Sequence, residues 1–207
     1  NYIYLTDKGR IHANVNLHDE EGTGLSFYTN REDTLANQDM TLELSRINLK
    51  EFRRILPYMP NMEGWIGAEA HYIDSGSNLM VSSDLRLDDF KYEGDALGSW
   101  ELGGVYLPGD AKDHHVDAYV RHNGNEIAHL GGIYLPTPDG VGSLSANVAF
   151  EHFPLNVVNP FVPDHMVELD GDIDGTLAMK GDPSKPLLNG ELALDSVTFF
   201  MPEMSAM

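Results

Sequence analysis

Apolar and polar residues alternate with a period of two along much of this chain, and that periodicity constrains the fold more than any other feature. Successive side chains of a β-strand point to opposite faces of a sheet, so alternation is typical of a strand with one apolar and one wet face. The pattern is clearest over residues 41–45, 84–88, 116–120 and 191–195. Turn-forming clusters at 74–78, 122–125 and 136–140 separate such segments, as antiparallel hairpins require. The sequence therefore predicts an all-β protein with an antiparallel-rich sheet.

One short helix is predicted over residues 48–56. Asn48 can cap its start, Glu51 occupies the third position after the cap, and Pro57 follows its end. Its apolar residues then fall on one face, namely Leu49, Phe52 and Leu56. A helix of about two and a half turns is too short to be stable alone. We therefore expect the apolar stripe to pack on the sheet that precedes or follows it.

The chain also resembles itself at an offset of about 107 residues. Leu49, Phe52, Ile55 and Pro57 recur 106 positions later as Leu155, Val158, Phe161 and Pro163. After one inserted residue, 62–66 match 169–173 and 84–88 match 191–195, and a shorter echo relates 102–108 to 130–136. We therefore divide the chain into a repeat unit of about 41–147 and a partial second unit of about 148–207. Both units belong to one continuous array over 1–207, which we expect to be a fragment of a longer protein.

Two architectures fit such a duplication. In the first, each unit of sheet plus helix covers the edge of its neighbour, so that the sheet extends and curls into a groove. In the second, an ordinary β-sandwich contains an ancient duplication. We favour the extended sheet because both copies keep the order of helix followed by strand. It predicts that the strands near 62–72 and 169–179 occupy equivalent places along one sheet.

The charge balance excludes one large class of partner. The chain has 33 acidic and 13 basic residues, a formal net charge of −20. Binding of nucleic acid needs a basic patch that releases counterions from phosphates, and the clustered cations are Lys50, Arg53 and Arg54 alone. We therefore expect no nucleic-acid partner. The sequence also has no cysteine and no apolar stretch of the roughly 18–20 residues that a membrane helix needs.

Two patterns suggest metal binding, but neither is complete. Asp170, Asp172 and Asp174 occupy the first, third and fifth positions of a calcium loop, yet its twelfth position is Gly181 instead of glutamate. The densest histidine group has no ligand spacing on one rigid element: His114, His115, His122 and His129. We interpret His115, Asp117, Tyr119 and Arg121 as a solvated strand face. We predict no metal, no cofactor and no catalytic residue, and therefore no enzyme. An acid-pair glycosidase is a distant third hypothesis, behind a binding module and a structural or adhesive segment.

The second copy resembles the TamB and AsmA-like envelope proteins. In that family an apolar-x-Gly strand leads through a G…P.L.G.L.L hairpin into a strand that ends in aromatic residues. Here the corresponding segments are 169–177 and 181–194, followed by Val197, Phe199 and Phe200. The segment from Pro154 to Pro163 resembles the short helix that precedes them. The resemblance is clearest over 144–201, fainter over 42–94, and not visible in the first forty residues.

The resemblance implies a long curled β-sheet, a β-taco, in the periplasm of a Gram-negative bacterium, within a protein anchored in the inner membrane. It implies lipid transport between membranes or outer-membrane protein assembly, with lipid acyl chains or nascent outer-membrane strands as cargo. An outer-membrane assembly-type barrel protein is then a possible partner of another part of the chain. The candidate groove residues are Leu85, Leu87, Tyr92, Val116, Ala118, Val120, Leu192, Leu194 and Phe199. The alternative hypothesis is a structural or adhesive β-repeat segment of a secreted or surface protein, without cargo.

Overall fold

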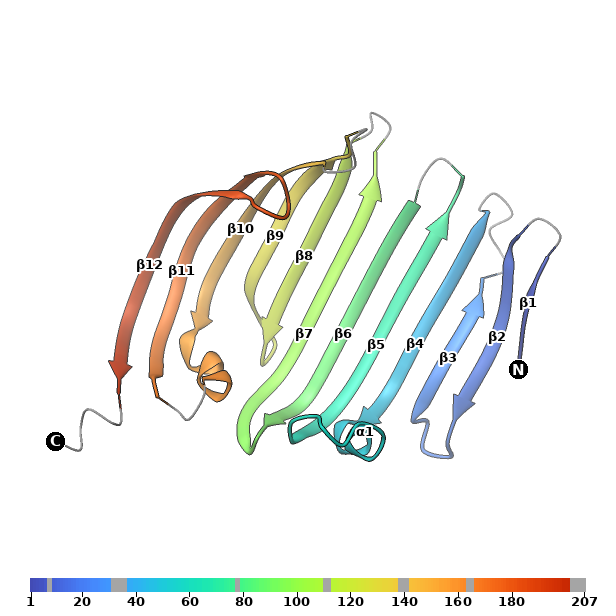
Figure 1. Cartoon of the computed structure of the whole chain (residues 1–207), viewed down its shortest axis with the longest axis horizontal. Helices are drawn as coiled ribbons and strands as arrows, with labels where there is room; N and C mark the ends of the chain where they lie inside the picture. Colours follow the sequence, from blue (N-terminus) through green and yellow to red (C-terminus); the bar gives the residue numbers. More distant parts are fainter. Residues whose placement is uncertain are drawn as a thin grey trace.

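The computed structural model describes residues 1–6, 9–30, 37–76, 79–109, 113–137, 142–162 and 166–201. Over these residues, twelve antiparallel strands form one sheet in which spatial order equals chain order (Figure 1). The strands are β1 (Tyr2–Leu5), β2 (Ile11–His18), β3 (Gly24–Thr29), β4 (Gln38–Asn48), β5 (Met62–Asp74), β6 (Leu79–Tyr92), β7 (Asp95–Pro108), β8 (His114–His122), β9 (Asn125–Leu135), β10 (Ser143–Pro154), β11 (Glu168–Gly181) and β12 (Leu187–Phe200). The sheet is not closed, because β1 and β12 each pair with a single neighbour. The prediction of an all-β, antiparallel fold is confirmed.

The four segments with the clearest alternation all lie in strands, namely β4, β6, β8 and β12. The predicted turn at 122–125 is a two-residue hairpin in which Asn123 and Gly124 both have positive φ, +50° and +84°. Glu93 and Gly94 form the same kind of turn between β6 and β7. Such turns match the right-handed twist of the flanking strands. The predicted turns at 74–78 and 136–140 join strands too, but residues 77–78 and 138–140 lie outside the described part.

The predicted helix is confirmed as α1 (Leu49–Ile55), with Asn48 as its N-cap. The side chain of Asn48 accepts a hydrogen bond from the backbone N–H of Lys50 at 3.0 Å, which satisfies one of the donors that a helix start leaves unpaired. Leu49 is buried where α1 packs on β5 and β4. The helix thus rests on the strands before and after it, as expected. Leu56 departs from the predicted stripe: it is the C-cap residue, one position past the end of α1, and it is 52% exposed.

The second helical segment, η1 (Leu155–Phe161), is a 3₁₀-helix rather than an α-helix. Pro160 lies inside it and lacks the N–H that an α-helical hydrogen bond would use. The side chain of Asn159 ties η1 to β11, because it accepts from the N–H of Leu169 and donates to its C=O, both at 2.8 Å. Pro163, the expected counterpart of Pro57, lies outside the described residues.

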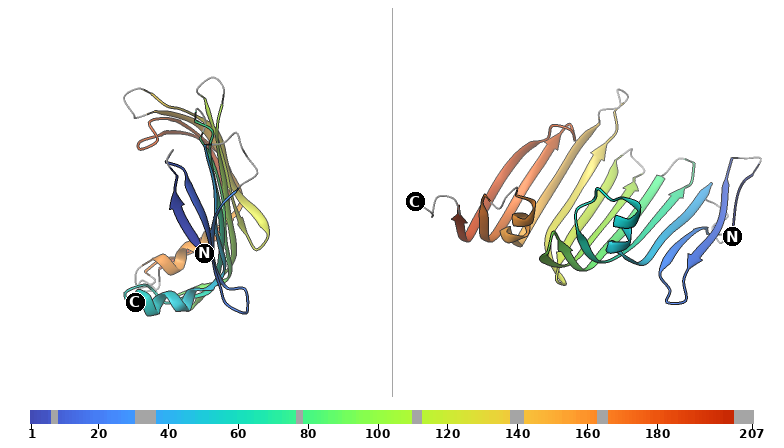
Figure 2. Two further views of the ribbon diagram at one scale, coloured as in Figure 1. Left: turned by 90° about the vertical axis from the view of Figure 1, so that its right-hand side faces the viewer. Right: turned by 60° about the horizontal axis from the view of Figure 1, so that its bottom comes forward.

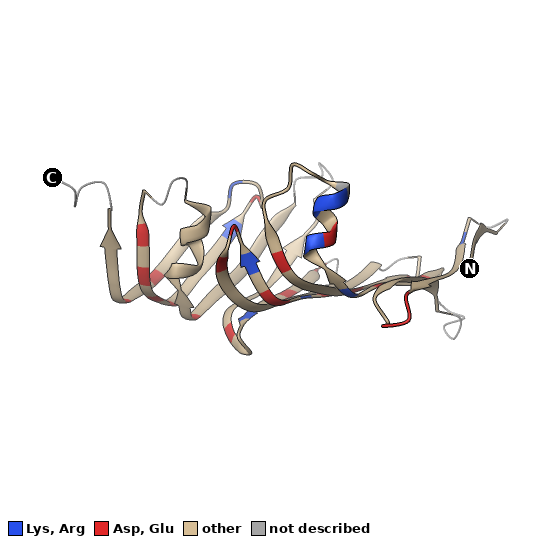
Figure 3. Cartoon of the chain, turned by 90° about the horizontal axis from the view of Figure 1, so that it is seen from below, with Lys and Arg blue, Asp and Glu red and all other residues tan. Residues whose placement is uncertain are grey.

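The sheet is curled. Its strands bend toward the side on which α1 and η1 lie, at one end of the strands (Figure 2, left). Seen from below, both helical segments stand on the same side of the sheet (Figure 3). We call this side the concave face and the opposite side the convex face.

β-Bulges interrupt the ladders close to the two helical segments. In β4 and β10 the register shifts between Leu44 and Ile47 and between Phe150 and Phe153, where Arg46 and His152 have positive φ. In β5 and β11 it shifts around Gly64 and Gly171, whose φ values are +116° and +105°. A bulge bends its strand and increases the local twist. These bulges therefore help to bend the ends of the strands near α1 and η1 toward the concave face.

The bulge glycines give a stability prediction. A Cβ at Gly64 would stand 2.6 Å from the backbone oxygen of Asp88, and one at Gly171 equally close to that of Asp195. We expect Gly64→Ala and Gly171→Ala each to lower the free energy of unfolding by roughly 1–3 kcal/mol in urea titrations. Gly67→Ala in β5 is the matched control, because its φ is not positive and its nearest contact is at 3.6 Å. Equal effects at all three positions would contradict the assignment of strain to the bulges.

Candidate functional site: the concave face

Cross-strand register gathers apolar residues into continuous rows on one face of the sheet. Directly paired residues share a face, so a row can be followed from strand to strand. One row runs from β2 to β12 and contains apolar residues and a single glycine: Leu17, Leu25, Leu44, Ala68, Leu85, Leu102, Val120, Ala128, Phe150, Gly175 and Leu192. An apolar stripe therefore crosses almost the whole width of the sheet.

Two further rows lie beside the first on the same face. One contains Val15, Phe27, Leu42, Ala70, Ser83, Gly104, Ala118, Leu130, Val148, Leu177 and Gly190. The other contains Met40, Tyr72, Val81, Tyr106, Val116, Gly132, Ala146, Met179 and Leu188. Ser83 is the one residue in these rows that is neither apolar, aromatic nor glycine.

The apolar rows lie on the concave face. His122 belongs to this side of the sheet, since it pairs with Trp100, which pairs with Leu87. It lines an open cavity together with Leu97 of β7 and Val157 of η1. η1 therefore stands over the end of the same face that carries the apolar rows.

The concave face is open rather than covered. Among the described residues only six apolar residues are buried: Ala13, Leu49, Leu97, Ile127, Ala146 and Val157. No large side chain of the described part is completely buried, and Leu102, in the middle of the first row, is 40% exposed. The apolar side chains are half-covered by their neighbours in the same sheet. A closed sandwich core is thus absent from the described part of the chain.

The predicted groove residues occupy this face. Leu85, Val120 and Leu192 share the first row, and Ala118 and Val116 belong to the second and third. Leu87 lies opposite Ile66 and Trp100, Leu194 opposite Ile173, and Phe199 opposite Leu169. Tyr92 lies past the bulge of β6, with its ring 4.7 Å from that of Phe161 in η1. That these residues bind lipid stays a prediction.

Several residues of the face were missed by sequence reasoning. Leu102 and Leu130 lie in the short echo of 102–108 and 130–136, so that echo could have pointed to them. Trp100 is a further example: its indole N–H donates to the C=O of Leu97 at 2.8 Å and its ring lies 4.4 Å from that of His122. Alternation around Trp100 is broken by Gly98 and Ser99, which explains why no period-two pattern revealed it.

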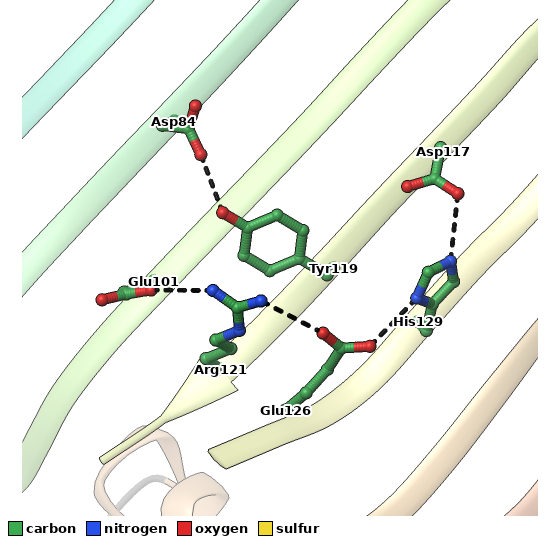
Figure 4. Close-up of polar contacts among 7 residues, drawn as sticks. All are labelled: Asp84, Glu101, Asp117, Tyr119, Arg121, Glu126 and His129. Carbon is green, nitrogen blue, oxygen red and sulfur yellow. Dashed lines mark hydrogen bonds and ion pairs between the residues drawn. The ribbon is translucent and has the colours of Figure 1, made fainter. Parts of the chain in front are cut away.

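The convex face carries a chain of polar contacts over β6–β9 (Figure 4). The Tyr119 hydroxyl donates to Asp84 at 2.8 Å, and the Arg121 guanidinium lies 4.4 Å from the Tyr119 ring centre. Arg121 also pairs with Glu101 and Glu126, at 3.4 and 3.5 Å. This strand face is solvated, as the sequence predicted for Asp117, Tyr119 and Arg121. The hydrogen bond to Asp84 raises the pKa of Tyr119 above its usual value.

A second polar cluster on the convex face joins β4 and β5. Asp39 is buried, and its carboxylate lies 2.7 Å from Nε2 of His71 and accepts a hydrogen bond from Asn30 at 2.7 Å. The amide of Asn30 also reaches the Thr41 hydroxyl at 3.1 Å. Because a buried carboxylate without partners is costly, we interpret the cluster as structural: it satisfies Asp39 at the convex surface.

His129 lies between two carboxylates and gives a pH prediction. Its ring nitrogens lie 3.0 Å from Glu126 and 3.0 Å from Asp117, and hydrogen bonds to these two residues raise the pKa of His129 above its usual value. A raised histidine pKa adds stability that is fully present below the unfolded-state pKa of about 6.5 and is lost as pH rises through the folded-state value. We therefore expect the melting-temperature difference between the native chain and His129→Gln to be largest near pH 5.5 and to shrink toward pH 8.5.

His152→Gln is the control for this pH series. His152 also contacts a carboxylate, Asp174 at 3.1 Å, but it is 75% exposed and has one such partner. Solvent screening weakens an exposed pair of this kind. A melting-temperature difference for His129→Gln that stays constant with pH, or grows as pH rises, would contradict the proposed role of the two carboxylates.

The residues considered for metal binding are not brought together. Asp170, Asp172 and Asp174 lie within strand β11, and the histidines are divided between the faces: His114 contacts Tyr106 on the concave side, whereas His129 lies on the convex side. Across the described ranges, no three His, Asp or Glu side chains are placed to hold a metal ion.

No helix within the described ranges is long and apolar enough to cross a membrane. Comparison with protein-family models, with curated proteins and with solved structures finds no match to this chain.

Proposed function

We propose that this chain is a non-catalytic β-sheet module whose concave face shelters lipid acyl chains from water. The observation that carries the proposal is the set of continuous apolar rows on a curled face that no second layer covers in the described part of the chain. An acyl chain costs about 0.8 kcal/mol per CH₂ group to expose to water. Isolated apolar pockets cannot offset that cost along a whole chain, but a continuous apolar surface can.

We also propose that the sheet is built from repeats of about 107 residues. Positive φ at Arg46 and His152 recurs at an offset of 106, and that at Gly64 and Gly171 at an offset of 107. Asp89 and Ser196, both with φ of +51°, are likewise 107 positions apart. The order β4–α1–β5–β6 also recurs as β10–η1–β11–β12. Bulges at corresponding places support a duplication more strongly than apolar residues do, since any amphipathic strand needs the latter.

The cellular setting follows from the resemblance of 144–201 to TamB and AsmA-like proteins. On that proposal the module belongs to an inner-membrane-anchored protein of the Gram-negative periplasm and takes part in lipid transport between the two membranes. Nascent outer-membrane strands are a second candidate cargo, because an amphipathic strand also has an apolar side to shelter. A structural or adhesive segment without cargo is the rival hypothesis, and the openness of the concave face argues against it.

A phospholipid with a diazirine group in its acyl chain tests the proposal. We expect photolysis to label residues of the concave face in the native chain, with the sites located by mass spectrometry. Leu102→Asp and Leu194→Asp place a carboxylate on that face at positions that are 40% and 63% exposed, where water can reach it. Both variants should therefore keep a native far-UV circular dichroism spectrum and lose most of the labelling.

Val105→Asp is the matched control on the convex face. Val105 is 36% exposed and pairs with Ser82 and Asp117, so its side chain belongs to a polar row. This variant should be labelled as strongly as the native chain. Labelling that is equal on the concave and convex faces would contradict the lipid proposal. Unfolding of both Leu102→Asp and Leu194→Asp would instead favour a closed apolar core and the rival hypothesis.

A further inference from the structure

An open cavity lies between η1 and the ends of β7, β8 and β11, on the concave side of the sheet. Its volume is about 880 Å³, and small-molecule sites usually occupy about 300–1,000 Å³. Two of the side chains that line it are apolar and buried, Leu97 at 7% exposure and Val157 at 8%. The cavity therefore has a preformed apolar floor and room for the polar head of a lipid.

The polar side chains of the cavity are hydrogen-bond acceptors, and their charge is negative. Asp95 and Glu168 line the cavity, and no Lys or Arg does. Within the described residues, neither carboxylate forms a hydrogen bond or an ion pair with another side chain. His122 donates through Nε2 to the C=O of Leu97 at 2.9 Å, so Nδ1 of the neutral ring is left as an acceptor. These groups suit a ligand that is positively charged and donates hydrogen bonds.

The corresponding positions at α1 have the opposite charge. At the offset of 106 residues, Asn156 and Asn159 of η1 correspond to Lys50 and Arg53 of α1. η1 has no charged residue, whereas α1 carries Lys50, Arg53 and Arg54 (Figure 3). The lack of cations at the cavity is therefore a property of the second copy and not of both helical segments. Only the site at η1 is suited to a cationic group.

An apolar track leads away from the cavity along β7 and β8. It begins where Trp100 pairs with His122. The concave-face residues that follow are Leu102, Gly104 and Tyr106 in β7 and Val120, Ala118 and Val116 in β8. A strand rises about 3.3 Å per residue, so the track from Trp100 to Tyr106 is about 20 Å long. In a bilayer one leaflet of acyl chains is about 15 Å thick, half of the hydrocarbon core. The track is therefore long enough for one acyl chain whose head lies in the cavity.

We propose that the cavity at η1 binds the primary ammonium group of a phospholipid whose acyl chain lies along β7 and β8, as phosphatidylethanolamine would provide. This inference rests on the proposed function and adds the class of headgroup. A primary ammonium donates three hydrogen bonds, and its charge is opposite to that of Asp95 and Glu168. The net charge of −20 acts in the same direction, because it repels a lipid of net negative charge.

The cavity favours a primary over a quaternary ammonium group. Quaternary groups such as choline have no N–H to donate and are recognised by the faces of aromatic rings. No Phe, Tyr or Trp lines this cavity. Phosphatidylcholine should therefore bind less well than phosphatidylethanolamine, although both lipids are zwitterionic.

Photolabelling with three lipids tests the headgroup. Phosphatidylethanolamine, phosphatidylcholine and phosphatidylglycerol carry the same diazirine-bearing acyl chain, each at the same molar fraction in phosphatidylcholine vesicles. Phosphatidylethanolamine should label the native chain on the order of five-fold more than phosphatidylglycerol, with phosphatidylcholine between them. The double variant Asp95→Asn/Glu168→Gln should lose most of this preference without losing the labelling by phosphatidylglycerol. Both residues are exposed, so the variant should fold.

The double variant Glu69→Gln/Glu191→Gln is the matched control. It removes the same two charges from the convex face, where Glu69 pairs with Asp84 and Glu191 with Thr176, and it should keep the native preference. Equal effects of the two double variants would overturn the inference, because the preference would then come from net charge. Equal labelling by all three lipids would also overturn it but leave the proposed function standing. No labelling by any of the lipids would contradict the proposed function itself.

The position of the diazirine tests where the head lies. With the head at η1, moving the diazirine from the glycerol end of the acyl chain to its methyl end should move the labelled site from Leu102 toward Tyr106. The reverse order would overturn the placement of the head. Ethanolamine, which has no acyl chain, should not compete at concentrations at which phosphatidylethanolamine does. Equal competition by ethanolamine would identify the ligand as a soluble amine and overturn the assignment to a lipid.

Discussion

The backbone ladders between neighbouring strands are the interaction on which the rest of this structure depends. In most β-proteins two sheets pack face to face, and burial between them specifies which residues point inward. Here one sheet stands alone over the described residues, and only six apolar residues are buried. The register of each strand must therefore be specified by its pairing with its two neighbouring strands, because no second sheet packs against it. A slip of one residue in any strand would move its apolar residues to the convex face, breaking the rows that run from Leu17 to Leu192.

The two faces of the sheet contribute different kinds of interaction to the fold. Ion pairs on the convex face, such as those of Arg121 with Glu101 and Glu126, are exposed and contribute little each. They keep a strongly acidic surface solvated and place opposite charges across neighbouring strands. On the concave face, apolar side chains of neighbouring strands contact one another, and these contacts leave each side chain half-buried. What is left exposed is a wide apolar surface, which is the feature on which the proposed shelter for acyl chains rests.

The sequence predicted the local elements well because their signals are local. Asn48 marks the start of α1, and Asn123 with Gly124 marks a two-residue hairpin, in each case through the hydrogen bonds or φ values that these residues favour. A curled sheet was predicted, but the places where the strands bend were not, since the bulges at Arg46 and His152 put ordinary residues at positive φ without a sequence signature. Pro160 made η1 a 3₁₀-helix. The first forty residues, whose resemblance to the rest was not visible, nevertheless contribute β1, β2 and β3 to the same sheet.

The openness of the concave face is the central claim, and thiol reactivity measures it most directly. Leu102→Cys lies in the middle of the apolar rows, Val105→Cys on the convex face serves as the exposed reference, and Ala146→Cys, at a site that is 4% exposed, serves as the buried one. In the lipid-free, folded chain, a water-soluble maleimide should modify Leu102→Cys within about ten-fold of the rate at Val105→Cys, and Ala146→Cys far more slowly. If Leu102→Cys reacts as slowly as Ala146→Cys, the face is covered and the account is wrong.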